Sequence, residues 1–86
     1  MNILITAAGA PAFYSIFNLI KEEFKNCNIF SCDTDSENIG SKISDNFFIV
    51  PGGNDKKYPE KIKTIIEENK IDIIFPLSDP EVVAIS

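Results

Sequence analysis

Short apolar runs alternate with longer amphipathic stretches along this chain of 86 residues. Four of the runs are rich in β-branched or aromatic side chains and are bounded by turn-forming residues, which predicts strands. These strands are expected over residues 2–6, 28–32, 47–50 and 71–75. Because the first run contains almost no polar residue, we expect a sheet that is covered on both faces.

Between the strands, the spacing of apolar side chains changes to that of a helix. From residue 12 to about residue 26, apolar side chains recur three or four positions apart while charged side chains take the other face. A second helix is expected from Pro59, a residue favoured at the first helical position, with an apolar stripe through residues 62–66. Residues 37–45 predict only a weak short helix. Pro80 indicates the start of one more helix.

The order of these elements predicts an α/β, Rossmann-like fold: a parallel four-stranded sheet with flanking helices and right-handed crossovers. Residues 1–86 are expected to form one domain that is incomplete at its C-terminus, because the last helix has barely begun at Ser86. In a parallel sheet, ligands bind beyond the carboxyl ends of the strands. The candidate loops at that edge are residues 7–11, 33–36, 51–55 and 76–81.

Composition and charge limit the partners that we expect. With 44% hydrophobic and 24% charged residues, the chain has the composition of a folded globular protein. Its net charge of −5 would repel phosphate backbones, so no nucleic-acid partner is expected. No Lys or Arg precedes the first apolar run, as a signal peptide requires, and polar residues, glycine and proline interrupt it. Neither export nor a membrane span is therefore expected.

The two cysteines predict no metal site. Cys27 and Cys32 are not spaced as CxxC, and the chain has no histidine, so a structural zinc site is not expected. We expect Cys32 to be buried on a strand and Cys27 to lie at the surface or its boundary. Reduced thiols are typical of a cytoplasmic protein.

The first loop is the first candidate site. Ala8, Gly9, Ala10 and Pro11 follow a strand and precede a helix, where small residues allow backbone N–H groups to approach an anion. A tight turn without a ligand explains the same residues equally well. A dinucleotide fingerprint needs more glycine than this, since Ala7, Ala10 and Phe13 stand where a nucleotide-sugar epimerase has glycine. An NAD-binding fragment is therefore the least favoured alternative.

Acidic residues supply the other candidates. Asp33 and Asp35 follow the second strand and would point the same way on an extended chain, where they could bind a cation or an ammonium group. Ordinary turn hydrogen bonds are the alternative. Ser78 or Asp79 can cap a helix begun by Pro80. Alternatively, Ser78, Asp79 and Glu81 present a hydroxyl and two carboxylates to a substrate or a neighbouring domain.

The ordered set of motifs resembles the beginning of ATP-grasp proteins, and most closely a group similar to the large subunit of carbamoyl-phosphate synthase. The motifs are Ile3-Leu4-Ile5-Thr6 with Gly9 and Pro11, Asp33-x-Asp35, Phe48-x-Val50-Pro51, and Ile71-Asp72-Ile73-Ile74-x-Pro76-x-x-Asp79-Pro80-Glu81. The resemblance covers essentially the whole chain. It identifies the chain as similar to the pre-ATP-grasp domain, which has a Rossmann-like fold.

The resemblance implies a ligase that joins a carboxylate to an amine or ammonia, using ATP and Mg²⁺ through an acyl phosphate. ATP and metal would be held by later domains, so no cofactor and no catalytic residue is expected within this chain. The expected partners are the remaining ATP-grasp domains of the parent protein and, because an apolar sheet face would remain uncovered, a second copy. A small, non-enzymatic, doubly wound binding module is the principal alternative.

Overall fold

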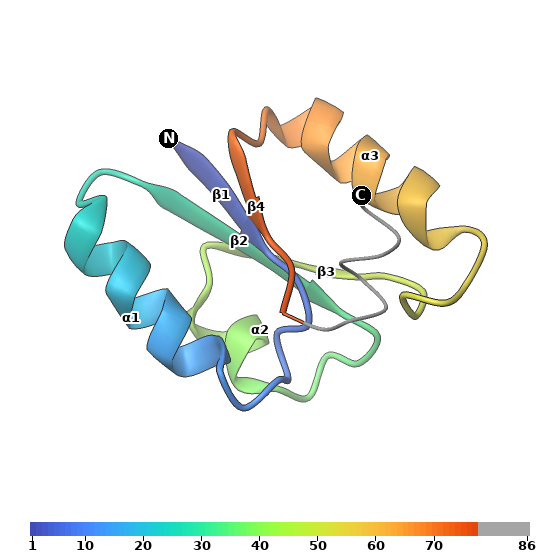
Figure 1. Ribbon diagram of the computed structural model, residues 1–86, viewed down its shortest axis with the longest axis horizontal. Coiled ribbons are helices and arrows are strands. Elements are labelled where there is room, and N and C mark those ends of the chain that lie inside the picture. Colours follow the sequence, from blue (N-terminus) through green and yellow to red (C-terminus); the bar gives the residue numbers. More distant parts are fainter. Residues whose placement is uncertain (78–86) are drawn as a thin grey trace.

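The computed structural model describes residues 1–77 and shows a parallel four-stranded sheet between two layers of helices (Figure 1). The elements in chain order are β1 (Asn2–Ile5), α1 (Phe13–Glu23), β2 (Asn28–Asp33), α2 (Ile39–Ile43), β3 (Asn46–Ile49), α3 (Tyr58–Asn69) and β4 (Ile73–Phe75). The strands lie in the order β3-β2-β1-β4, and all three neighbouring pairs are parallel. The predicted fold class is therefore confirmed.

The two faces of the sheet are covered by different helices. α1 and α2 lie on one side of the sheet in Figure 1, and α3 lies on the other. Along β1 the side chains alternate between the layers: Ile3 and Ile5 pack in the core under α1, and Leu4 packs in the core under α3. All three side chains are fully buried, as the apolar first strand predicts.

α1 is shorter than its apolar pattern indicates. Phe13, Phe17 and Ile20 form its buried face, and the Phe13 and Phe17 rings lie 5.9 Å apart. The helix ends at Glu23 because Phe24 leaves the helical conformation, at φ −123° and ψ 82°. The following turn brings the chain back beneath the helix, so that β2 can begin beside β1.

The same turn corrects the prediction for Cys27. This cysteine is buried, with the α1-side core around it, and does not lie at the surface. Asn26 and Asn28, which flank it, are both exposed and correctly indicate a turn. The turn folds under α1, however, and directs the intervening thiol inward. Cys32 is buried on β2 as expected.

Residues at each end of α3 determine where the helix begins and ends. Pro59 and Glu60 lie in its first turn, where a missing N–H costs nothing and a carboxylate favours the positive end of the helix dipole. At the other end, Lys70 adopts the left-handed conformation (φ 53°), and the Ile71 N–H donates to the Ile66 carbonyl. Ile71 is thus used in ending the helix, which is one reason why β4 begins at Ile73 rather than at residue 71.

Asn2 fastens this end of the sheet to α3. Its side-chain amide donates to the carbonyls of Asn69 and Lys70, over 2.8 and 3.2 Å. Its backbone N–H donates to the Asp72 carboxylate, and its carbonyl accepts from the Asp72 N–H. One residue therefore connects the first strand to the loop that leads into the last one.

The two edge strands are less buried than the central pair. Every residue of β4 is only half-buried, and in β3 the Ile49 side chain is 59% exposed. The expectation of a sheet covered on both faces holds for β1 and for most of β2, whereas β3 and β4 are edges among the described residues. No helix in the described part of the chain is long and apolar enough to cross a membrane.

Candidate functional site

The loops at the carboxyl ends of the strands meet at one edge of the sheet, as the sequence predicts. The Gly9 N–H donates to Asp33 Oδ2 over 2.6 Å, which joins the loop after β1 to the end of β2. The Val50 N–H donates to the Asp33 carbonyl over 3.0 Å, and the Thr6 N–H donates to the Phe75 carbonyl over 3.1 Å. We call this edge, residues 6–12, 33–38 and 50–57, the carboxyl rim.

Three predicted site residues cannot be placed on the rim. Ser78, Asp79 and Glu81 lie outside the described residues, although Pro76 and Leu77 of the same predicted loop are described and follow β4 directly. The candidate site is therefore built here from the first three loops.

The backbone N–H groups of the first loop donate their hydrogen bonds within the protein itself. The Ala8 N–H donates to the Cys32 carbonyl over 3.0 Å, the Gly9 N–H donates to Asp33, and the Ala10 N–H donates to the Ala7 carbonyl over 2.8 Å. Pro11 has no N–H to offer. An anion at Ala8–Pro11 would have to break one of these hydrogen bonds, so the geometry favours the tight-turn interpretation of the loop over anion binding.

The substitutions for glycine have visible consequences in this loop. Ala7 adopts the left-handed conformation, at φ 53°, which glycine adopts without strain. Phe13, which also stands where a nucleotide-sugar epimerase has glycine, is fully buried and packs against Phe17 in the core. The loop thus keeps the backbone path of a glycine turn while its side chains fill the space beneath the loop.

Sequence reasoning missed the role of Gly40, on the short helix α2. A Cβ built there would collide with the Cβ of Ala8, and it would lie 3.1 Å from the Phe13 ring and 3.2 Å from Asn38 Oδ1. Asn38 itself caps α2 by accepting from the Ser41 N–H over 2.9 Å. Gly40 therefore allows α2 to press against the first loop. The sequence signal that could have indicated this close contact is a single glycine in a weakly helical stretch.

The two aspartates after β2 act separately, which corrects the expectation of a parallel pair. Asp33 ends the strand, and its carboxylate accepts from Gly9 and from the Thr34 N–H, the latter over 2.7 Å. The chain bends at Thr34, so the extended geometry that would align the carboxylates is absent. Asp35 instead accepts from the Glu37 N–H over 2.9 Å. Among residues 1–77, no three acidic, cysteine or histidine side chains gather as metal ligands.

The third loop borders a shallow hollow that the sequence did not indicate. It has a volume of about 320 Å³ and lies between Pro51 and the first two turns of α3, where Lys57, Lys61 and Thr64 line it with Glu60. Two ammonium groups and a hydroxyl can hold a carboxylate or a phosphate by charge and hydrogen bonding.

A comparison with protein families decides the relationship. The family model of the PylC-like N-terminal domain matches residues 3–86. The chain belongs to this family. The PylC-like N-terminal domain is the pre-ATP-grasp domain of ATP-grasp enzymes, so the coarser part of the resemblance found in the sequence is confirmed. No curated protein is similar enough to support a further inference from sequence.

Solved structures support the fold of this PylC-like domain. A dTDP-glucose 4,6-dehydratase from Bacillus anthracis, determined in complex with NAD, aligns with 98% of the chain at a TM-score of 0.66 and 15% sequence identity. The chain spans 28% of the length of that protein. Identity at this level shows a shared fold alone.

Proposed function

We propose that this chain is the N-terminal domain of an ATP-dependent ligase that joins a carboxylate to an amine or ammonia, similar to the large subunit of carbamoyl-phosphate synthase. The observation that carries the proposal is the match of the PylC-like N-terminal domain to residues 3–86. In this proposal the chain is not catalytic alone. ATP and Mg²⁺ are held by the other domains of the parent protein, in the cytoplasm.

The geometry of the carboxyl rim supports a shaping role rather than a chemical one. The first loop is closed by its own hydrogen bonds, and Asp33 is occupied by Gly9 and Thr34. A surface fixed in this way can form one wall of a pocket that is completed by another domain. The proposed role is therefore to bound the acceptor-substrate side of the ligase, with Gly9, Ala10 and Pro11 at the wall.

The test compares this chain with its parent protein. The purified 86-residue chain, given ATP, Mg²⁺, a panel of carboxylates and ammonia, is expected to release no ADP. The parent protein is expected to release ADP only when both a carboxylate and an amine or ammonia are present. ADP release by the isolated chain, or a parent protein without such ligase activity, would refute the proposal.

A variant pair tests the shaping role. Pro11 is exposed on the rim, and Asn26 is exposed at the opposite end of the sheet, so Pro11→Glu and Asn26→Glu add the same charge at the two ends. In the parent enzyme, Pro11→Glu is expected to raise the KM for the acceptor about tenfold and to leave the KM for ATP unchanged. Equal effects of the two variants would contradict the role of the rim.

A further inference from the structure

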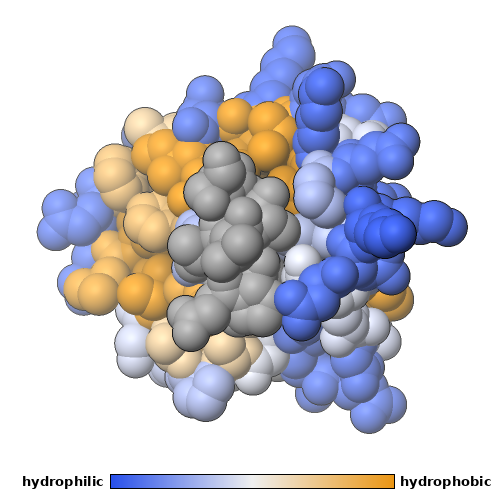
Figure 2. Space-filling view, turned by 45° about the vertical axis from the view of Figure 1, so that its right-hand side comes forward, coloured by the Kyte–Doolittle hydropathy of each residue, from blue (hydrophilic) through white to orange (hydrophobic). Residues whose placement is uncertain are grey.

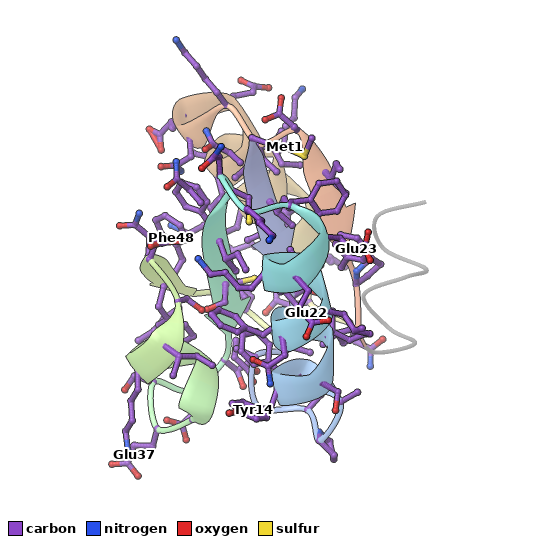
Figure 3. All side chains as sticks on the ribbon, turned by 90° about the vertical axis from the view of Figure 1, so that its left-hand side faces the viewer. Met1, Tyr14, Glu22, Glu23, Glu37 and Phe48 are labelled. Carbon is purple, nitrogen blue, oxygen red and sulfur yellow. The ribbon has the colours of Figure 1, made fainter. Side chains whose placement is uncertain are left out.

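Positive charge is concentrated at the beginning of α3. Residues 56–63 contain four of the chain's eight lysines and a single acidic residue, Glu60, although the net charge of the chain is −5. Figure 2 shows hydrophilic residues gathered on the α3 side of this face, whereas the α1 side is hydrophobic. Glu22 and Glu23 lie on α1, across the sheet from α3 (Figure 3). The start of α3 is therefore a positive surface on an acidic protein.

The hollow beside Pro51 lies within this positive segment. Lys57, Glu60, Lys61 and Thr64 recur at the spacing of one helix face and form one wall, and Pro51 forms the other. The Thr64 hydroxyl donates to the Glu60 carbonyl over 3.1 Å, so the two lysines are the donors left for a ligand. The volume of about 320 Å³ lies at the lower end of the range for small-molecule sites, about 300–1,000 Å³, and is larger than a single ion needs.

Hydrogen bonds and burial hold both walls of the hollow in place. Val50, the residue before the proline, is buried, and its N–H donates to the Asp33 carbonyl over 3.0 Å. Tyr58, in the first turn of α3, is fully buried. Asp55 accepts from the Lys57 N–H over 2.8 Å through its carboxylate and from the Tyr58 N–H over 3.1 Å through its carbonyl. Because these backbone donors are occupied, an anion in the hollow would be held by side chains and not by the helix N-terminus.

Lys57 and Lys61 are both available to an anion. Neither ammonium group forms an ion pair with another residue within 1–77, whereas Lys63, which does not line the hollow, lies 4.0 Å from Glu67. Positions four residues apart are separated by about 6 Å along a helix, and like charges at this spacing repel each other. An anion between the two lysines would relieve this repulsion, and lysine is a common ligand of phosphate.

We propose that this hollow binds the phosphate group of a small molecule. Lys57 and Lys61 contact two oxygens of the phosphate, and the rest of the molecule lies against Pro51. A phosphate monoester carries a charge of about −1.5 to −2 at pH 7 and three terminal oxygens, so it matches two ammonium groups better than a carboxylate does. Glu60 repels the phosphate and keeps the binding weak. The proposal goes beyond the proposed ligase function and does not depend on it.

Titration of the ¹⁵N-labelled chain with inorganic phosphate, phenyl phosphate and acetate tests the proposal. At about 0.1 M salt, exposed charges more than about 10 Å apart are largely screened, so binding depends on nearby groups. The amide signals of Lys57, Glu60, Lys61 and Thr64 are expected to shift and to saturate, with a dissociation constant for phosphate on the order of 1 mM. Phenyl phosphate is expected to bind about threefold more tightly, because its ring buries apolar surface against Pro51.

Variants separate this site from general positive charge. The double variant Lys57→Gln with Lys61→Gln is expected to raise the dissociation constant for phosphate about tenfold. Lys56→Gln with Lys63→Gln removes the same charge from lysines that do not line the hollow, and is expected to change the constant less than about twofold. Glu60→Gln is expected to lower it about threefold, a gain that a misfolded protein would not show.

Four results would overturn the proposal. Equal weakening by the two double variants would show that phosphate responds to general positive charge. Shifts that fail to saturate at about 50 mM phosphate would show that the hollow is not a site. Acetate binding as tightly as phosphate would contradict the assignment to phosphate. Phenyl phosphate binding more weakly than the free ion would contradict a ligand that extends over the proline.

Discussion

The contact between Gly9 and Asp33 can be perturbed from either side, and the effects of the two substitutions on stability should not be additive. Asp33→Ala removes the acceptor of the 2.6 Å bond from Gly9 and of the 2.7 Å bond from Thr34. Hydrogen bonds to a charged group contribute about 1.5–3 kcal/mol each, and water can replace part of this at a half-exposed site. We expect Asp33→Ala to lower the free energy of unfolding by roughly 2 kcal/mol.

Gly9→Ala perturbs the same contact sterically. Gly9 does not have a positive φ, so alanine fits its backbone conformation, but the added Cβ would lie 2.8 Å from Asp33 Oδ2. The carboxylate cannot swing away freely, because its other oxygen is held by Thr34. Overpacking of this kind costs about 1–3 kcal/mol, whereas a tolerated Gly→Ala change gains about 0.4–1 kcal/mol.

The sign of the Gly9→Ala effect should therefore depend on Asp33. In the wild-type chain Gly9→Ala is expected to destabilise by about 1 kcal/mol; in the Asp33→Ala background it is expected to be neutral or slightly stabilising. Urea unfolding of the four proteins measures the coupling, and Asp35→Ala, which loses one exposed loop hydrogen bond, is the matched control. An equal cost of Gly9→Ala in both backgrounds would refute the reasoning.

Three further predictions concern close approach, a strained residue and the Asn2 fastening. Gly40→Ala should destabilise by about 2 kcal/mol, because α2 must withdraw from the first loop. Gly52→Ala, where an added Cβ meets nothing within 4 Å, should change stability by less than about 0.5 kcal/mol; equal thermal melts would contradict this. Lys70→Gly should raise the melting temperature, since glycine relieves about 1 kcal/mol of left-handed strain; a lower melting temperature would count against it. Asn2→Ala should cost about 1–3 kcal/mol by urea unfolding, and the exposed Asn26→Ala almost nothing; similar midpoints would show that the fastening is unimportant.

The element order could be predicted because hydrophobic spacing reports burial directly. A short apolar run bounded by turn-forming residues predicts a strand, and apolar side chains three or four positions apart predict a helix; these patterns located all four strands and both long helices. The boundaries of elements depend on tertiary contacts instead. α1 ends at Glu23 although Phe24 continues the apolar stripe, because the chain must turn to start β2 beside β1. The burial of Cys27 was predicted wrongly for the same reason.

The location of the candidate site could be predicted from the sequence, but the hydrogen bonds of its residues could not. Parallel strands bring their carboxyl ends to one edge, so the meeting of the Gly9 and Asp33 loops followed from the fold. The sequence could not show that Asp33 would occupy the Gly9 N–H, since that depends on a contact between residues 24 positions apart. Nor could it show that Gly40 makes room for Ala8 and Phe13.

The first loop is closed by the protein's own hydrogen bonds, and we propose that this domain therefore shapes a site without binding a nucleotide. Titration of the ¹⁵N-labelled chain with NAD and with Mg·ATP, followed through its amide resonances, tests this most directly. We predict that the amide signals of Ala8, Gly9 and Ala10 do not shift at ligand concentrations on the order of 1 mM, at which even weak specific binding would be detected. Saturable shifts of these three signals would contradict the account.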